Sequence, residues 1–293
     1  MTGGASRRTA AVVVNYESGP SLARCVDDLA ACGLATVVVV DNGSTDGSLV
    51  AGIAAAPGIE VVDPGVNLGY GTATNRGAAA STSEFVLVCN PDLEVPADAV
   101  ETLADALDRD PGLALVGPLI RTPSGDRYPS ARQFPSMIDA AGHAMLGIFA
   151  PDNRFTRSYQ RSELDATGDD ASGIGTVDVD WVSGACFLVR REAFEEVGGF
   201  DESFFMYLED VDLCWRLERA GWRVGYVPAA EVTHLQGRST DRHPYRMILE
   251  HHRSLLRFAA RSSTGWHRAL LPLVAVGIAV RCGLASTARA LGR

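Results

Sequence analysis

Short apolar runs alternate with amphipathic segments through the first 117 residues of the chain. Residues 10–14 and 36–40 are rich in β-branched side chains and end at polar positions, and Leu22, Val26 and Leu29 recur between them at helical spacing. Further strands are predicted at residues 59–62, 84–89 and 113–116, with helices at about residues 70–80 and 97–108. This alternation predicts an open α/β half, built on a parallel sheet, that binds a nucleotide.

The pattern becomes less regular after residue 117. Residues 166–176 are rich in Gly, Asp and Ser, which predicts a mobile loop. An apolar stretch at residues 180–190 is interrupted by Ser183 and Gly184, and residues 210–220 have the spacing of an amphipathic helix. Two short strands are predicted after that helix, at residues 223–227 and 232–234. We therefore expect a second block in which strands and helices are mixed.

The C-terminal segment is basic and helical in pattern. From residue 242 onward, Arg residues alternate with apolar ones, and an apolar run of 12 residues follows at 269–280, closed by Arg281. Because about 20 apolar residues are needed to cross a bilayer, this run predicts interfacial helices at a membrane surface, not a spanning one. The alternatives are packing against the rest of the chain or against a second subunit in a homodimer.

Charge is distributed unevenly. The chain of 293 residues has 26 basic residues, all Arg, against 36 acidic ones, for a net charge of −10. This balance argues against an overall basic nucleic-acid binder. Residues 238–293 hold ten Arg and only Asp241 and Glu250, so an acidic body precedes a basic tail. Such a tail fits peripheral contact with an anionic membrane.

Cysteine usage and the N-terminus both indicate the cytoplasm. The six Cys residues include no C-x-x-C pair, which suggests free thiols and neither a zinc site nor a disulfide framework. Arg7 and Arg8 lead directly into the first predicted strand without a small-residue cleavage pattern, which argues against a signal peptide. We expect a cytoplasmic protein that lies on the inner face of the cell membrane.

Polar residues follow three of the predicted strands in the first half. Asp41 ends the second strand, and Asp92 lies just beyond the strand at 84–89, within Asn90-Pro91-Asp92. A Gly-rich stretch at residues 65–71 opens the helix that contains Asn75 and Arg76, where backbone amides and a guanidinium suit a diphosphate. Ligands bind at the carboxyl ends of parallel strands, and a diphosphate beside carboxylates requires Mg²⁺ or Mn²⁺.

A second acidic cluster begins the helix predicted at 210–220. Glu209 and Asp210 stand at its start, where acids also favour the helix dipole, so capping is one interpretation. The other is that one carboxylate is a general base that accepts a hydroxyl proton. His234, after a short strand, is a candidate second metal ligand or phosphate contact.

Taken in order, these segments resemble the family-2 inverting glycosyltransferases of the GT-A fold, over about residues 11–239. The residues that carry the resemblance are V-V-V-N-Y at 12–16, V-V-D-N-G-S-T-D-G-S at 39–48, N-L-G-Y-G at 67–71 with Asn75, N-P-D at 90–92, W-V-S-G-A at 181–185, G-G-F-D-E-S-F-F at 198–205, L-E-D-V-D-L at 208–213 and H-L-Q-G-R-S at 234–239. Within the family the spacing is most similar to rhamnosyltransferases, in particular those of actinobacteria that act on N-acetylglucosaminyl-diphospho-polyprenol.

The resemblance implies a fold and a division of the chain. It implies a GT-A domain at residues 9–239, with a Rossmann-like, mostly parallel mixed sheet flanked by helices, and a helical tail at residues 240–293. It also implies a metal-dependent transfer of a sugar, L-rhamnose from deoxythymidine-diphospho-rhamnose, to a polyprenyl-diphosphate-linked N-acetylglucosamine during the synthesis of the cell-wall arabinogalactan linker or another polysaccharide.

The resemblance also implies a role for each matching residue. Asp210 and Glu209 are implied to be catalytic, with Asp210 as the base, and Asp92 and His234 to hold Mg²⁺ or Mn²⁺. The implied acceptor or sugar pocket contains Trp181, Ser183 and Gly184. The implied nucleotide contacts are Asn15, Tyr16, Glu17, Asp41, Asn67, Gly69, Asn75, Arg76 and Asn90. Asn90 occupies the first position of the family's usual Asp-x-Asp, where an amide oxygen brings no charge.

Three other functions remain open at this stage. A uridine-diphospho-sugar donor with another acceptor fits the same motifs. A sugar-nucleotide pyrophosphorylase shares a related core but normally has a Gly-rich N-terminal loop with a basic residue, which residues 15–18 do not supply. A catalytically silent module that binds a nucleotide sugar is argued against by Glu209 and Asp210, and only a measurement of activity separates it from an enzyme.

Overall fold

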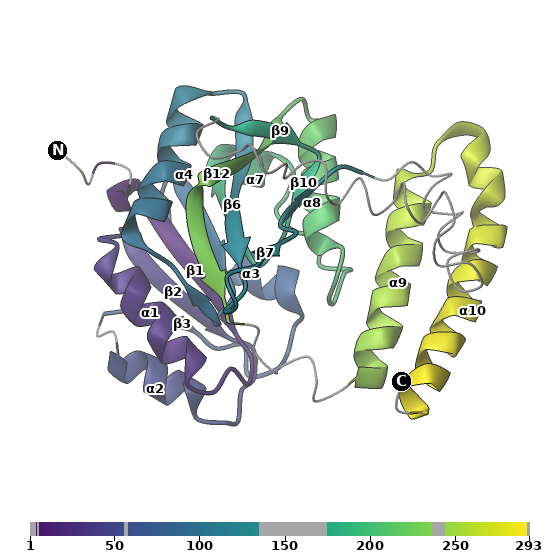
Figure 1. Ribbon diagram of the computed structural model, residues 1–293, viewed down its shortest axis with the longest axis horizontal. Coiled ribbons are helices and arrows are strands. Elements are labelled where there is room, and N and C mark those ends of the chain that lie inside the picture. Colours follow the sequence, from purple (N-terminus) through teal and green to yellow (C-terminus); the bar gives the residue numbers. More distant parts are fainter. Residues whose placement is uncertain (1–3, 5, 56–57, 135–174, 236–243, 292–293) are drawn as a thin grey trace.

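The computed structural model describes residues 4, 6–55, 58–134, 175–235 and 244–291. A sheet with helices on both faces forms the larger part, and two long antiparallel helices stand beside it (Figure 1). In chain order the elements are η1 (Ser6–Arg8), β1 (Thr9–Asn15), α1 (Ser21–Ala31), β2 (Thr36–Asp41), α2 (Ser48–Ala55), β3 (Glu60–Val62), α3 (Tyr70–Ala79), β4 (Phe85–Cys89), β5 (Leu93–Glu94), α4 (Ala97–Arg109), β6 (Leu113–Arg121), β7 (Arg127–Tyr128), β8 (Ala131–Arg132), β9 (Val177–Val179), β10 (Trp181–Val182), β11 (Cys186–Arg190), α7 (Arg191–Glu196), α8 (Glu209–Arg219), β12 (Arg223–His234), α9 (Pro244–Ser262), η4 (Gly265–Leu270) and α10 (Leu271–Ala290).

The main sheet is mixed. Its strand order is β3-β2-β1-β4-β11-β6-β12-β5, with β7 beside β6 and β9 beside β12. Strands β3, β2, β1 and β4 are mutually parallel, which confirms the α/β half predicted for the first part of the chain. Strand β11 enters antiparallel between β4 and β6, and β12 runs parallel to β6. The carboxyl ends of β1, β2, β4, β6 and β12 therefore lie at one edge of the sheet, together with the amino end of β11.

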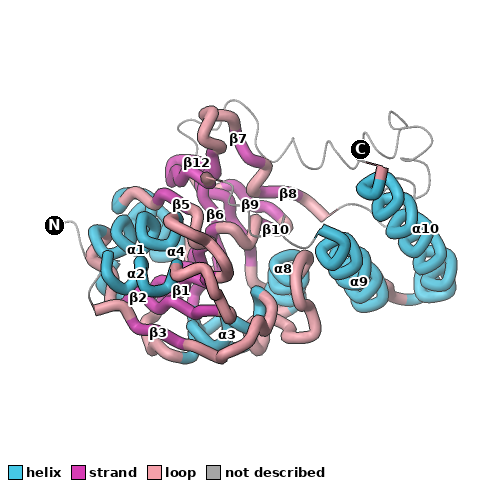
Figure 2. The backbone as a smooth tube through the Cα atoms, turned by 90° about the horizontal axis from the view of Figure 1, so that it is seen from below, coloured by secondary structure: helices cyan, strands magenta, loops and turns pink. Residues whose placement is uncertain are grey.

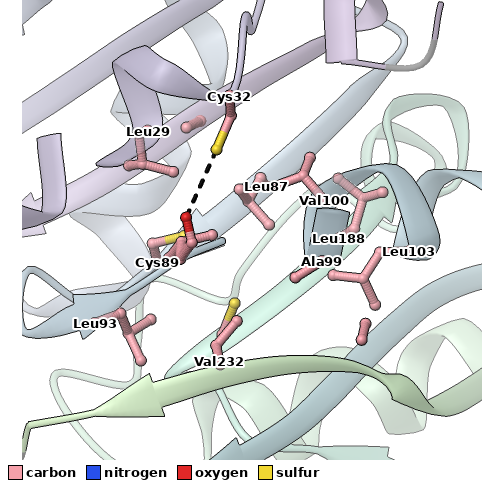
Figure 3. Close-up of a cluster of buried hydrophobic side chains, with 14 of the residues drawn as sticks. Leu29, Cys32, Leu87, Cys89, Leu93, Ala99, Val100, Leu103, Leu188 and Val232 are labelled. Atoms are coloured by element: carbon pink, nitrogen blue, oxygen red, sulfur yellow. Dashed lines mark hydrogen bonds between the residues drawn. The ribbon is translucent and has the colours of Figure 1, made fainter. Parts of the chain in front are cut away.

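Alternating side chains of the strands build a core on each face of the sheet. Within β1, Val13 packs with α1 and α4 on one face, while Val12 packs with α3 and α8 on the other. Figure 3 shows the first of these cores, in which Leu29, Leu87 and Val100 converge. Each fully buried Leu contributes about 1.5–3 kcal/mol relative to an exposed one, so these two layers fix the sheet that carries the site.

Two details differ from the sequence predictions. One twelve-residue strand, β12, replaces the two short strands predicted at 223–227 and 232–234, because a register shift between Val227 and Glu231 lets the chain continue beside β6. Strand β6 reaches Arg121, beyond the predicted end at 116. Residues 166–174 of the predicted mobile loop, and the predicted domain boundary at 239/240, lie outside the described residues. All six cysteines are free thiols, as expected.

The tail forms a helical hairpin of α9 and α10 (Figure 2). Helix α9 packs on the larger part, whereas α10 buries only Ile278 and exposes most of its apolar side chains. In the described part of the chain, Gly265–Ala290 is a helical stretch of 26 residues with an 18-residue window of mean hydropathy 1.9, long and apolar enough to cross a membrane. The argument that the 12-residue run is too short to span is therefore wrong on length, because the helix continues past Arg281.

Candidate active site

The predicted site residues of the first half meet at the carboxyl edge of the sheet. Asn15 ends β1 and Asp41 ends β2, in register with one another, and both are buried. Asn15 Nδ2 donates to Asp41 Oδ1 at 2.7 Å and to Ser48 Oγ at 2.9 Å, and the Ser44 amide donates to Asp41 Oδ2 at 3.2 Å. The Asp41 carboxylate is thus held in one orientation by neighbouring strand and loop.

Glu17 fixes the loop above this pair. Its Oε1 accepts from the amide and the hydroxyl of Thr45, at 2.7 and 2.8 Å, while its own amide donates to Ser44 Oγ at 3.1 Å. Glu17 has a positive φ of 52°. Tyr16 lies half-buried directly before it. The loops after β1 and β2 therefore form one hydrogen-bonded wall.

The Gly-rich loop after β3 packs against that wall through Asn42, which is buried and follows Asp41. Its Oδ1 accepts from the Leu68 amide at 2.8 Å, and its Nδ2 donates to Asn67 Oδ1 at 3.1 Å. The Gly69 amide also donates to Asn67 Oδ1, at 3.0 Å. Gly69 has φ 88°, and a Cβ there would lie 2.3 Å from Phe205 O. Only glycine therefore fits between the Gly-rich loop and the segment that contains Phe205.

Asp92 and His234 meet at the same edge of the sheet, and their assignment as metal ligands stays a prediction. The short strand β5 pairs with the end of β12 and sets His234 opposite Leu93. His234 Nε2 lies 3.1 Å from Asp92 Oδ1, and both side chains are only 12% exposed. His234 Nδ1 is buried without a hydrogen-bond partner among the described residues. In the described part of the chain no cluster of three or more His, Cys, Asp or Glu side chains suited to a metal is found.

Glu209 and Asp210 begin helix α8, and Asp210 lies against the turn that leads into β11. Asp210 Oδ2 accepts from the Gly184 amide at 2.7 Å, and its Oδ1 accepts from the Val211 amide at 2.8 Å. A Cβ at Gly184 would lie 3.2 Å from Asp210 Oδ2, so this glycine leaves room for the carboxylate. Glu209 is 7% exposed, and its Oε2 has no partner among the described residues.

Burial gives these two acids unusual proton affinities. It raises the pKa of Glu209 to about 8, with the neighbouring Asp210 charge adding to the effect, and it raises the pKa of Asp210 in the same direction. The two backbone amides on Asp210 favour its charged form, whereas Glu209 lacks such donors on Oε2. The surroundings therefore favour the neutral form of Glu209 and make Asp210 the better candidate proton acceptor.

Hydrogen bonds beside the ends of β4 and β11 link the Asn90-Pro91-Asp92 turn to the segment that binds Asp210. The Asn90 amide donates to Ala185 O at 2.8 Å, which places the Asn90-Pro91-Asp92 turn beside Gly184 and its partner Asp210. Tyr70, the first residue of α3, donates its hydroxyl to Gly184 O at 2.7 Å. The start of α3, the Asn90-Pro91-Asp92 turn and Asp210 are thus linked through Gly184 and Ala185.

Other predicted residues have partners that give them structural roles. Asn75 donates to Phe200 O at 2.9 Å and accepts from the Phe200 amide at 2.8 Å, so its amide locks α3 to the turn that follows α7. These bonds give no support to Asn75 as a nucleotide contact, which stays a prediction. Arg76 is exposed on α3, and Ser183 donates its amide to Ser130 O at 2.8 Å. Trp181 carries the Arg132 guanidinium 5.0 Å from its ring centroid.

Sequence reasoning missed three residues that shape the site. Asn42, Tyr70 and Arg132 act through partners that are distant in the chain or separated by a loop. Asn42 and Tyr70 belong to the motifs at 39–48 and 67–71, so their polar side chains beside Asp41 and Gly69 could have indicated a role in the site. Arg132, whose charge opposes the rise that burial causes in the pKa of Asp210, lies in no motif, so no sequence signal pointed to it.

The mixed sheet, flanked by helices and with acidic side chains at its carboxyl edge, is the fold of the GT-A glycosyltransferases. The profile of Glycosyl transferase family 2 matches residues 10–198, and the chain belongs to this family. It is a glycosyltransferase, and the pyrophosphorylase interpretation gives way to this class.

Relatives and solved structures agree with this assignment. The chain is 44% identical over 276 residues to the N-acetylglucosaminyl-diphospho-decaprenol L-rhamnosyltransferase of Mycobacterium tuberculosis H37Rv, covering 89% of this chain and 86% of that one. It is 30% identical to the rhamnosyltransferase WbbL of Escherichia coli K12, over 70% of this chain and 74% of the relative. The mannosyltransferase PcManGT of Pyrobaculum calidifontis, solved with GDP-Man and Mn²⁺, has the same fold, with a TM-score of 0.56 at 19% identity over 98% of this chain and 76% of that chain.

Proposed function

We propose that this protein transfers L-rhamnose from deoxythymidine-diphospho-rhamnose to N-acetylglucosaminyl-diphospho-polyprenol, with inversion at the anomeric carbon. The observation that carries the proposal is the 44% identity, over nearly the whole chain, to an enzyme named for that acceptor and that sugar. The geometry of the site supports the reaction class, because the Asp210 carboxylate is fixed by two backbone amides beside the candidate diphosphate site.

The nucleotide of the donor is proposed to bind at the ends of β1 and β2. Asp41 is fixed by Asn15 and Ser44, so its free acceptor capacity points in one direction toward a base N–H. The loop at Asn67 and Gly69 closes the other side of this pocket through Asn42. A pocket held by its own hydrogen bonds loses little freedom when the nucleotide binds, which favours affinity.

The proton of the attacking hydroxyl passes to Asp210. As the acceptor oxygen forms its bond to the anomeric carbon, the bond from that carbon to the diphosphate oxygen breaks, and the nucleoside diphosphate leaves. A carboxylate whose pKa is raised by burial is a stronger base than one in water. General-base catalysis contributes about 10²- to 10⁴-fold, and correct placement of both substrates removes on the order of 7–11 kcal/mol from the barrier.

The residues at Asp92 and His234 fit a divalent cation. They offer one carboxylate oxygen and one imidazole nitrogen at a buried edge, and within the described ranges the Nδ1 of His234 has no hydrogen-bond partner. Mn²⁺ and Mg²⁺ sites of this kind use one or two protein carboxylates and fill the rest with phosphate oxygens and water. When bound, the cation supplies positive charge for the departing diphosphate.

The tail is proposed to keep the enzyme at the inner face of the membrane, where a polyprenyl-linked acceptor lies. Its apolar side chains at Leu273, Val276, Val280 and Leu284 are 42–60% exposed on one side of α10. Contact through this face buries apolar area in the bilayer, and the Arg residues of the tail add attraction to anionic lipid. A homodimer formed through the same face is the competing arrangement.

The proposal is tested with purified full-length protein. It is given a panel of nucleotide sugars and a short-chain N-acetylglucosaminyl-diphospho-lipid, with and without a chelator, and products are read by mass. We expect one added deoxyhexose from deoxythymidine-diphospho-rhamnose and loss of that product with chelator. If a product formed only from a uridine-diphospho-sugar, that sugar would take the place of deoxythymidine-diphospho-rhamnose as the assigned donor. Nucleotide binding without any product would favour a different acceptor or a catalytically silent module.

A further inference from the structure

Helix α9 touches the segment that leads into the catalytic carboxylates. The Ser254 hydroxyl, which is buried, donates to Met206 O at 2.9 Å. The rings of His251 and Tyr207 meet edge to face, with centroids 5.4 Å apart. Since Met206 and Tyr207 lie three to four residues before Asp210, the tail reaches the base-bearing end of α8.

The backbone at this point has an unusual conformation. Tyr207 has φ 67° and Leu208 has φ 61°, both in the left-handed region, directly before Glu209. Non-glycine residues persist there only where the surrounding structure holds them. Two contacts at this segment come from α9 and not from the sheet: the Ser254 hydroxyl binds Met206 O, directly before the pair, and the His251 ring meets the ring of Tyr207.

Arg261, near the end of α9, binds the first turns of α8. Its Nη1 donates to both oxygens of Asp212, at 2.8 and 3.0 Å, and its Nη2 donates to Asp201 Oδ2. The Asp212 side chain is fully buried and is also bound by Arg216 Nε at 2.7 Å. A buried carboxylate depends on such partners, so Arg261 ties α9 to α8 and to the segment before it at once.

We propose that α9 is a positioning element of the transferase: through Arg261, Ser254 and His251 it holds the start of α8 so that Asp210 stays against the Gly184 amide. The tail then has a role in catalysis besides any role at the membrane. This inference rests on the proposed function, because it takes Asp210 as the base.

Hydrogen exchange of the full-length protein tests the coupling without any substrate. We compare the wild type with Arg261→Gln, and use Arg253→Gln as the control, because Arg253 is exposed and, among the residues that the structure describes, pairs only with Glu250 of its own helix, at 3.0 Å. Exchange in the peptides spanning 181–185 and 208–213 is expected to rise in Arg261→Gln and to stay at the wild-type level in Arg253→Gln, with β1 and β2 unchanged in both. Asp201→Asn, which leaves the buried Asp212 paired, is a milder second variant with the same expected direction.

Kinetics of the same variants separate positioning from loss of folded protein. In Arg261→Gln, kcat is expected to fall about 10- to 100-fold, as for small misplacements of a catalytic group, while KM for the donor stays unchanged. Loss of the Gly184 bond raises the pKa of Asp210, so the acid limb of the kcat profile moves to higher pH. Glu209, Arg132 and Tyr70 also face Asp210 and are the same in both enzymes. Arg261→Lys, which keeps the charge without the fork, is expected to recover part of the rate.

Each outcome has one meaning. Unchanged exchange at 181–185 and 208–213 in both Arg261→Gln and Asp201→Asn overturns the inference, whatever the activity. The inference is also overturned if the rate falls equally at every pH and fewer donor molecules bind per protein molecule, because such a loss comes from unfolded protein. If exchange rises in Arg261→Gln but none of the proteins, the wild type included, transfers a sugar, the coupling between α9 and α8 stands and the proposed function is rejected.

Discussion

Glu209 and Asp210 are neighbouring carboxylic acids whose surroundings give them different protonation. The amides of Gly184 and Val211 stabilise charge on Asp210, whereas Glu209 Oε2 is buried without a partner among the described residues. Burial and the Asp210 charge therefore raise the pKa of Glu209 and favour its neutral form, whereas the two amides favour the charged form of Asp210. Under the proposed function these two backbone hydrogen bonds favour Asp210 as the base, and residue type alone does not reveal this preference.

Replacing Glu209 by Gln is expected to flatten the dependence of stability on pH. In the folded protein burial raises the pKa of Glu209 to about 8, against an ordinary value of 4.5. The folded state therefore keeps a proton that the unfolded chain releases between these values, so this contribution is fully present below pH 4.5 and is lost as pH rises through 8. Thermal denaturation across this range should show the wild type losing stability relative to Glu209→Gln. Parallel curves for the two proteins would contradict the assignment.

At the scale of elements, the loop between β3 and α3 is built around one glycine. Gly69 combines φ 88° with a Cβ position 2.3 Å from Phe205 O, whereas Gly65 has φ 73° and nothing within 4 Å. Gly69→Ala is expected to lower the melting temperature more than Gly65→Ala, which adds only backbone strain of about 1–2 kcal/mol. It should also weaken nucleotide binding, measured by titration, because the Asn67 loop is displaced. Equal effects of the two substitutions would refute this account of the loop.

The elements that the sequence predicts well are those whose pattern is local. Strands β1, β2 and β4 alternate with helices in their own sequence, so Asp41 and Asp92 could be placed at strand ends in advance. The continuous strand β12 could not, since its register shift between Val227 and Glu231 depends on pairing with β6, a hundred residues earlier. Asn42 and Arg261 were missed for the same reason, because their partners lie in other elements.

The whole molecule joins an acidic α/β body to a basic helical hairpin. Arg261 turns part of that charge inward to Asp212 and Asp201, so the tail's arginines are not all available to lipid. Helix α10, by contrast, leaves a row of apolar side chains outside. The body and α9 belong to one structural unit, and α10 carries the surface that remains for a membrane or a second copy.

Polar substitutions on α10 are expected to release the protein from membranes. The double variant Val276→Ser, Val280→Ser changes residues that are 60% and 52% exposed, and the control Val50→Ser, Ile53→Ser changes residues of α2 that are 72% and 44% exposed. Flotation with vesicles containing anionic lipid should show binding weakened by about 10-fold or more in the α10 variant only. Equal binding of all three proteins, with a change in oligomeric state of the α10 variant, would assign this face to a dimer.

The central claim is that Asp210 accepts the proton of the attacking hydroxyl. The most direct measurement compares Asp210→Asn with the wild type in two assays, donor binding by titration and single-turnover transfer to the N-acetylglucosaminyl-diphospho-lipid. Because the amide cannot take a proton and Asp210 touches neither Asp41 nor Asn67 through any hydrogen bond described above, transfer should fall by about 10²- to 10⁴-fold with donor affinity unchanged. Transfer that persists in Asp210→Asn, or a loss that follows lost donor binding, would show that the base lies elsewhere.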